Sequence, residues 1–180
     1  IRYYTEQLKH YGVKIHLNTS FELKNFQEGN FEELVWATGV VPSEYAWEEN
    51  DGSLPVLNYV EAIQRNASLG NEVVVLGAGG IAMDVASLLT QTTETKEEYS
   101  AHWGIDVQLE HRGALQNKQE RTPLRKVSIL QRSNKKLGNK LGKTTVWSHR
   151  TELQQLGVGV FNGSTGLKIL GGELLFNSNG

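Results

Sequence analysis

The clearest hydrophobic pattern of this chain lies in its middle. The continuous β-branched and apolar run Glu72–Leu76 predicts a parallel strand that is covered on both faces. A glycine-rich turn, Gly77–Gly80, follows it, and apolar residues at helical spacing predict a helix over 81–89. A second buried strand is predicted at 127–130. The chain therefore contains at least one strand, turn, helix and strand unit.

The pattern before this unit is weaker. Apolar residues at helical spacing predict a helix that begins near Tyr3 and stops at Gly12, a residue that suits a helix end. Alternation over Val13–Leu17 predicts a strand with one buried face, and Phe21–Leu23 continues as a strand. The run Glu33–Ala37 predicts a short buried strand.

The remaining segments complete an alternating α/β order. Short helices are predicted at 59–65 and 147–156, a strand at 158–161 and a hairpin at 167–176. The 92–126 connection is much longer than the usual few residues, which indicates a lid or an insertion. The fold class predicted is α/β, with a Rossmann-like NAD(P)-binding domain that has a parallel sheet and a β-hairpin or meander.

A weak internal repeat relates the two ends of the chain at an offset of 145 residues. Leu8, Gly12, Val13 and Ile15 match Leu153, Gly157, Val158 and Val160. A chance match remains an alternative. A genuine repeat predicts two similar dinucleotide-binding units, the first without its glycine-rich opening.

Composition narrows the class of protein. The chain has 180 residues, 38% of them hydrophobic, no cysteine, and no apolar run of the roughly 18 residues that a spanning helix requires. A cytoplasmic protein without membrane partners is the expectation. It begins at Ile1 and has no clear closing element, so we interpret it as a piece of a longer polypeptide. We expect no metal ligands and no catalytic residues here.

Charge is concentrated in one window. The net charge is −2, yet nine of the 18 Lys and Arg residues lie within Arg121–Arg150, a window without Asp or Glu. Few aromatic side chains are interleaved with them, which counts against nucleic acid as a partner.

The glycine-rich turn carries the main chemical prediction. A strand, then Gly77-x-Gly79-x-x-Ala82, then a helix is the arrangement that receives a dinucleotide pyrophosphate at a helix N-terminus. The first glycine permits a tight turn, the second lets a phosphate approach, and the small third residue allows close packing. The predicted pyrophosphate site comprises Gly77, Ala78, Gly79, Gly80, Ile81 and Ala82.

The end of the second strand predicts which cofactor is bound. An acidic residue there would favour NAD, whereas this strand ends in Gln131, Arg132 and Ser133, followed by Lys135 and Lys136. Arg132 is suited to the 2′-phosphate of NADP(H). A solvated basic loop is the alternative, and the roughly 20-residue spacing usual for this motif is exceeded because of the 92–126 insertion.

Two further segments are candidate cofactor contacts. Ala37-Thr38-Gly39 lies at the end of a predicted strand and is a weak signal by itself. Its position ahead of the glycine motif at 77–82 strengthens the signal. Lys143 and Thr144 precede a predicted helix and are candidates for a phosphate or a flavin edge, although a capping role for Thr144 or Thr145 is equally consistent.

These motifs together resemble one known family. The segments 74–81, 102–106 (His-Trp-Gly-Ile-Asp), 130–132 and 141–150 (Leu-Gly-Lys-Thr-Thr onward) are similar to the C-terminal region of bacterial NADPH-dependent 2,4-dienoyl-CoA reductases. In this resemblance Ala82 stands where many relatives have glycine, and Val146 where glycine is expected.

The resemblance implies a place in a larger flavoprotein of fatty acid β-oxidation. Residues 1–55 would be part of an FAD-binding domain of the two-dinucleotide-binding flavoprotein type, and 56–180 the NADP-binding domain, truncated at its C-terminus. An Old-Yellow-Enzyme-like barrel, in the missing N-terminal region, would carry FMN and a 4Fe-4S cluster and be the partner within the same polypeptide. Hydride would pass from NADPH to FAD, so the piece alone would be an inactive part of an oxidoreductase.

Two alternatives stay open at this point. A trimethylamine-dehydrogenase-like protein has a similar build, with ADP in the second nucleotide site. A non-catalytic NAD(P)-sensing module is the other.

Overall fold

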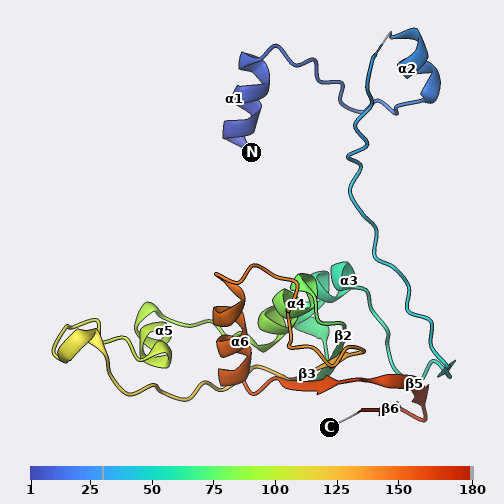
Figure 1. Ribbon diagram of the computed structural model, residues 1–180. Helices are drawn as coiled ribbons and strands as arrows, with labels where there is room; N and C mark the ends of the chain where they lie inside the picture. Colours follow the sequence, from blue (N-terminus) through green and yellow to red (C-terminus); the bar gives the residue numbers. More distant parts are fainter. Residues whose placement is uncertain (30, 179–180) are drawn as a thin grey trace. The chain divides into compact units, whose positions relative to one another are not determined.

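The computed structural model describes residues 1–29 and 31–178. Figure 1 shows the order of the elements along the chain. The chain divides into two compact units, of which the first spans Ile1–Val40 and the second begins at Val41. Residues 41–55, assigned above to the FAD-binding part, therefore belong to the second unit by their contacts. The division into an FAD part and an NADP part remains a prediction.

The first unit contains two short helices. Helix α1, Arg2–His10, confirms the predicted helix and ends where expected, because Gly12 adopts φ +65° and the Val13 N–H donates to the Leu8 carbonyl at 2.9 Å. Helix α2, Leu23–Glu28, begins with a capping box in which the Glu22 N–H donates to the Asn25 side chain at 2.7 Å.

The three strands predicted in this unit are wrong. Among the described residues of Ile1–Val40 no strand forms, and Leu23 belongs to α2. Leu17 and Val35 are 79% and 84% exposed. An alternating pattern indicates which face a strand would bury, but a strand also needs a hydrogen-bonding neighbour. No neighbouring strand exists in the described part of this unit.

The second unit is built on a parallel sheet. Strands β2 (Glu72–Leu76), β3 (Lys126–Gln131) and β4 (Gly159–Asn162) lie in the order β2-β3-β4. Leu76 is level with Leu130, and Gln131 with Asn162, so the carboxyl ends of the three strands meet at one edge. These strands confirm the mixed α/β class and the predicted strand positions.

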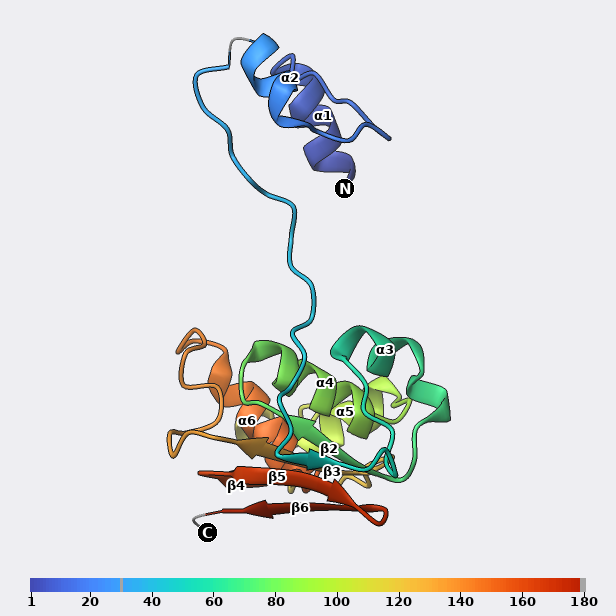
Figure 2. The ribbon, with the colours of Figure 1, turned by 90° about the vertical axis from the view of Figure 1, so that its right-hand side faces the viewer.

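Two helices cover one face of this sheet, as Figure 2 shows. Helix α4, Gly80–Thr90, connects β2 to the insertion, and α6, Val146–Gln155, connects β3 to β4. Their apolar sides meet β3 in one core, whose most buried members are Met83, Ala86, Leu89, Val127, Ile129 and Leu153. Helix α6 ends as α1 does, because Gly157 adopts φ +66° and the Val158 N–H donates to the Leu153 carbonyl at 2.9 Å.

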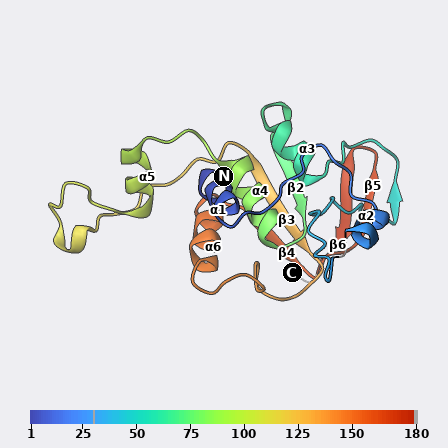
Figure 3. The same ribbon diagram turned by 90° about the horizontal axis from the view of Figure 1, so that it is seen from above.

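A second sheet has the order β1-β5-β6. The predicted hairpin is confirmed as β5 (Thr165–Leu170) and β6 (Glu173–Asn177), whereas β1 (Glu49–Asn50), parallel to β5, has no counterpart in the sequence pattern. Figure 3 shows the hairpin on the side of the parallel sheet away from α5 and α6. The Asp51 carboxylate accepts from the Gly171 N–H at 2.7 Å, which holds the strand β1 segment to the hairpin turn.

The long connection between α4 and β3 contains its own structure. Helix α5 is Lys96–Trp103, the 3-10 helix η2 is Arg112–Ala114, and Figures 1 and 3 show the segment between them reaching away from the sheet. Arg121 pairs with Glu94 and lies 3.7 Å from Glu152 on α6. Before β2 lie α3 (Tyr59–Gln64), as predicted, and the 3-10 helix η1 (Asn66–Ser68).

Candidate functional site

The glycine turn lies at the carboxyl edge of the parallel sheet, the edge at which α/β proteins hold their ligands. Gly77 follows β2, and its N–H donates to the Leu130 carbonyl of β3 at 2.8 Å. Gly79 is the N-cap of α4 and supplies no side-chain cap. The N–H groups of the first turn of a helix have no partner within the helix, so they remain available to an anion at this position.

Gly77 and Gly79 differ in whether the backbone requires glycine at their position. Gly77 adopts φ +113°, a conformation that residues with a side chain rarely take. Gly79 has φ −83° and ψ −176°, which any residue adopts, and a Cβ added there meets no atom within 4 Å. Neither the backbone nor packing requires glycine at 79. A side chain at 79 would occupy the open space in front of the N-terminus of α4.

The other residues of the turn differ in how deeply they are buried. A Cβ at Gly80 would lie 3.3 Å from the Leu141 side chain, so this position is in close contact with the loop after β3. Ala82 is partly buried and Ile81 is exposed. Ala78 lies against the core, and its carbonyl accepts from the Gly138 N–H at 3.1 Å.

The predicted specificity residues follow β3 at the same edge. Gln131 is buried, and its amide nitrogen donates to the Lys135 carbonyl at 2.6 Å and to the Asn162 side chain. The side chain of Gln131 thus holds the loop rather than facing solvent. Arg132 is exposed, and the Ser133 hydroxyl oxygen accepts from the Lys135 N–H at 3.0 Å.

The positive charges of this segment have no acidic partners in the described structure. The ion pairs of the described residues include none made by Arg132, Lys135 or Lys136. No carboxylate stands at the end of β3 to repel a phosphate. The strand end therefore presents net positive charge to solvent.

The loop between β3 and α6 folds back over the glycine turn. Leu137 and Gly138 are buried in an otherwise polar loop, and the Arg150 Nε–H of α6 donates to the Leu137 carbonyl at 2.7 Å. Sequence reasoning missed Gly138 as a site residue. The repeated Leu-Gly pairs at 137–138 and 141–142, apolar within a basic segment, were the signal that could have indicated it.

Lys143 and Thr144 lie at the far end of this loop, both exposed. Helix α6 has Thr145 as its N-cap, and no side chain caps it, so the structure shows neither threonine hydroxyl in a capping role. Instead the Thr144 carbonyl accepts from the Trp147 indole N–H at 3.0 Å. This contact fixes the indole beside the start of α6.

A pocket of about 480 Å³ opens between this loop and α6. We call it the basic pocket, because four of its lining residues are cations and none is acidic. Its lining consists of Lys135, Lys136, Gly138, Asn139, Leu141, Lys143, Val146, Trp147 and Arg150.

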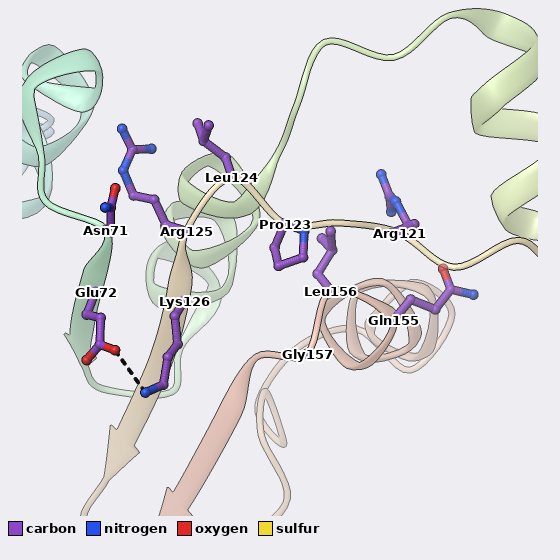
Figure 4. Close-up of a pocket in the computed structure, with 10 residues that line it drawn as sticks. All are labelled: Asn71, Glu72, Arg121, Pro123, Leu124, Arg125, Lys126, Gln155, Leu156 and Gly157. Carbon is purple, nitrogen blue, oxygen red and sulfur yellow. Dashed lines mark hydrogen bonds and ion pairs between the residues drawn. The ribbon is translucent and has the colours of Figure 1, made fainter.

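A second pocket, of about 430 Å³, lies at the opposite edge of the sheet (Figure 4). Its walls come from the amino ends of β2 and β3 and from the end of α6 near Gly157. Two of its lining residues, Glu72 and Lys126, form an ion pair at 3.0 Å, which the dashed line in Figure 4 marks. It is separate from the glycine turn, which lies at the carboxyl ends of the same strands.

Ala37, Thr38 and Gly39 belong to the first unit and are exposed, outside any helix or strand. Gly39 adopts φ +78°. The strand that was predicted to lead into them is absent. Their assignment as cofactor contacts stays a prediction. Among the residues that the structure describes, no helix combines the length and the apolar character that crossing a bilayer requires.

Comparison with known proteins supports the fold. No protein-family model matches the sequence. A solved structure of 2-naphthoyl-CoA reductase in complex with 2-naphthoyl-CoA is similar, with a TM-score of 0.59 and 20% sequence identity. The match covers 99% of this chain but only 22% of that one. At this identity the likeness shows a shared mixed α/β fold, and the chain spans about a fifth of the length of the protein it matches.

Proposed function

We propose that this chain provides the NADP(H)-binding part of a flavin-dependent reductase of the 2,4-dienoyl-CoA reductase type. The observation that carries the proposal concerns position 79. Neither the backbone angles nor the neighbouring atoms require a glycine there. A pyrophosphate at the N-terminus of α4 would need the space that a side chain there would fill. The open space at Gly79 therefore supports a ligand at this turn.

The residues after β3 support NADP(H) over NAD(H). Arg132 is exposed and unpaired among the described residues, and its planar fork matches the oxygens of a 2′-phosphate. The Ser133 hydroxyl oxygen accepts from a backbone N–H, which leaves its own hydrogen free to donate to a phosphate. NADP(H) would supply hydride when bound, and the residues of this chain would hold and orient it.

The sequence resemblance and the similar fold, rather than the site geometry, support a flavin and an acyl thioester in the longer protein. The sequence motifs at 74–81, 102–106 and 141–150 resemble dienoyl-CoA reductases, and the similar fold of 2-naphthoyl-CoA reductase comes from a protein that acts on a CoA thioester. We infer that FAD accepts the hydride in the longer protein, and that FMN, a 4Fe-4S cluster and the acyl-CoA site lie outside this chain.

The proposal is tested by calorimetric titration of the full chain with NADPH and NADH. The wild type should bind NADPH more tightly than NADH. Gly79→Val should weaken binding of both by more than about tenfold, because the side chain obstructs the pyrophosphate. The matched control is Gly70→Val, since a Cβ at Gly70 also meets nothing within 4 Å and this residue precedes β2 at the other end of the strand.

Both variants should unfold at nearly the same temperature as the wild type, so loss of binding would not reflect loss of folding. Equal affinities of the two glycine variants for NADPH would contradict the proposal. A wild type that binds ADP as tightly as NADPH, and gains nothing from the 2′-phosphate, would instead favour the trimethylamine-dehydrogenase-like arrangement.

A further inference from the structure

The basic pocket concentrates positive charge without compensation. Lys135, Lys136, Lys143 and Arg150 line it, and none of them forms an ion pair in the described part of the chain. Among these four, and within the described residues, only Arg150 has a hydrogen-bonded head group, through its Nε–H to the Leu137 carbonyl. A concave surface lined by charges of one sign focuses the field and attracts the opposite charge. The pocket is therefore suited to an anion.

Two hydrogen bonds connect residues that line this pocket to the predicted cofactor site. The Gln131 amide donates to the Lys135 carbonyl, which holds the pocket rim at the end of β3. Gly138, in the pocket lining, donates to Ala78 of the glycine turn. Lining residues of the pocket are thus hydrogen-bonded both to the strand end that precedes Arg132 and to the turn proposed to hold the pyrophosphate.

The walls of the pocket also suit a nucleotide. Trp147, 60% exposed, presents an indole whose orientation is held by the Thr144 carbonyl. Leu141 adds an apolar side chain to the lining. Cations beside an exposed aromatic ring and an aliphatic side chain match a phosphate attached to a ribose and a base.

From these contacts we infer that the basic pocket holds a phosphate monoester dianion, which in NADP(H) is the 2′-phosphate. Lys143 and Arg150 then share with Arg132 the choice between NADP(H) and NAD(H). This inference rests on the proposed function and extends its phosphate site from the strand end to α6. A phosphate monoester carries about −1.5 to −2 charges near neutral pH, which several cations together neutralise.

The decisive variant is Lys143→Gln, because the Lys143 side chain makes no hydrogen bond or ion pair within the described residues and its loss leaves the loop intact. The matched control is Lys140→Gln, a cation in the same loop that is exposed and does not line the pocket. Titrations of the full chain with NADPH, NADH and inorganic phosphate compare the variants. Lys143→Gln should weaken NADPH binding by about tenfold and leave NADH unchanged, and Lys140→Gln should change neither.

Arg150→Lys is a second variant that keeps the charge but loses the fork. It should weaken NADPH binding less than Arg150→Gln does, provided both unfold like the wild type. Competition by millimolar inorganic phosphate against NADPH but not against NADH would place a free phosphate in the same pocket and support the inference. NADPH affinities unchanged in both Lys143→Gln and Arg150→Gln would overturn it, as would an equal loss for NADPH and NADH. Failure of the wild type to bind either nucleotide would instead reject the proposed function.

Discussion

The N–H of Gly138 donates a hydrogen bond to the carbonyl of Ala78 at 3.1 Å, joining the loop after β3 to the glycine turn after β2. These residues are 60 positions apart in the chain, and the contact brings the glycine turn and the loop after β3 together in one candidate site. The same loop presses Leu141 against Gly80. The geometry of the candidate site thus depends on a backbone contact that is independent of the charged side chains around it.

Gly138 should be the most sensitive glycine of this loop. It adopts φ +64°, and a Cβ there would lie 2.6 Å from the Met83 sulfur and 2.9 Å from Val146. Left-handed strain and overpacking together should lower the free energy of unfolding of Gly138→Ala by about 2–4 kcal/mol. Urea denaturation measures the change.

Gly171→Ala provides the matched control, because Gly171 has φ +59° but a Cβ there meets nothing within 4 Å. This substitution should lower the free energy of unfolding by about 1 kcal/mol, the effect of backbone strain alone. Equal losses in the two variants would show that packing around Gly138 contributes nothing.

Arg132→Ala should reduce affinity for NADPH specifically. Removal of a charge-assisted contact to the 2′-phosphate should cost about 1.5–3 kcal/mol, or roughly ten- to a hundredfold in affinity, with little change for NADH. Lys135 and Lys136 can compensate in part, so the triple variant with all three residues neutral is the stricter test. If the triple variant still prefers NADPH in calorimetric titration, the strand end does not select the cofactor.

Asp106 should make the stability of the insertion depend on pH. The backbone N–H of His111 donates to the Asp106 carboxylate and lowers the pKa of this carboxyl below its ordinary 3.8. The Gln108 N–H donates to it as well and lowers the pKa to a smaller extent. Because the pKa is lower in the folded state, the ionised Asp106 stabilises the fold. This stabilisation is complete above about pH 4 and is lost as the pH falls through the folded-state pKa. Asp106→Asn should therefore lower the free energy of unfolding more at pH 7 than at pH 3.

The control for Asp106 is Glu110→Gln, an exposed acid in the same loop. It should give the same small change at both pH values in urea denaturation. A loss in Asp106→Asn that is as large at pH 3 as at pH 7 would show that the contacts of Asp106 do not depend on its charge.

The purified chain should be colourless. The described residues among the first 40 form no strand, glycine turn and helix unit that could receive a second pyrophosphate, and none of them is buried. An FAD molecule would have little to hold it. The visible absorption spectrum tests this expectation, and a yellow sample with one flavin per chain would contradict it.

Strands β2, β3 and β4 and helices α4 and α6 of the second unit were predictable because local steric effects specify them. The β-branched run at Val73–Val75 favours a strand in almost any buried surrounding. Glycine at 77 suits a turn whose backbone takes φ +113°. β2 and β3, both predicted as buried strands, pair in parallel over five residues. Much of this domain was therefore evident from the order of its residues.

Other features depended on partners that the local pattern does not contain. Val13–Leu17 alternates like a strand and yet forms none, whereas Glu49–Asn50 lacks a strand pattern and still pairs with β5. The convergence of Lys143 and Arg150 on one pocket likewise arises from the way the loop closes over the glycine turn. Backbone hydrogen bonds between distant segments decide these outcomes, because a strand or a pocket exists only when its second side is in place.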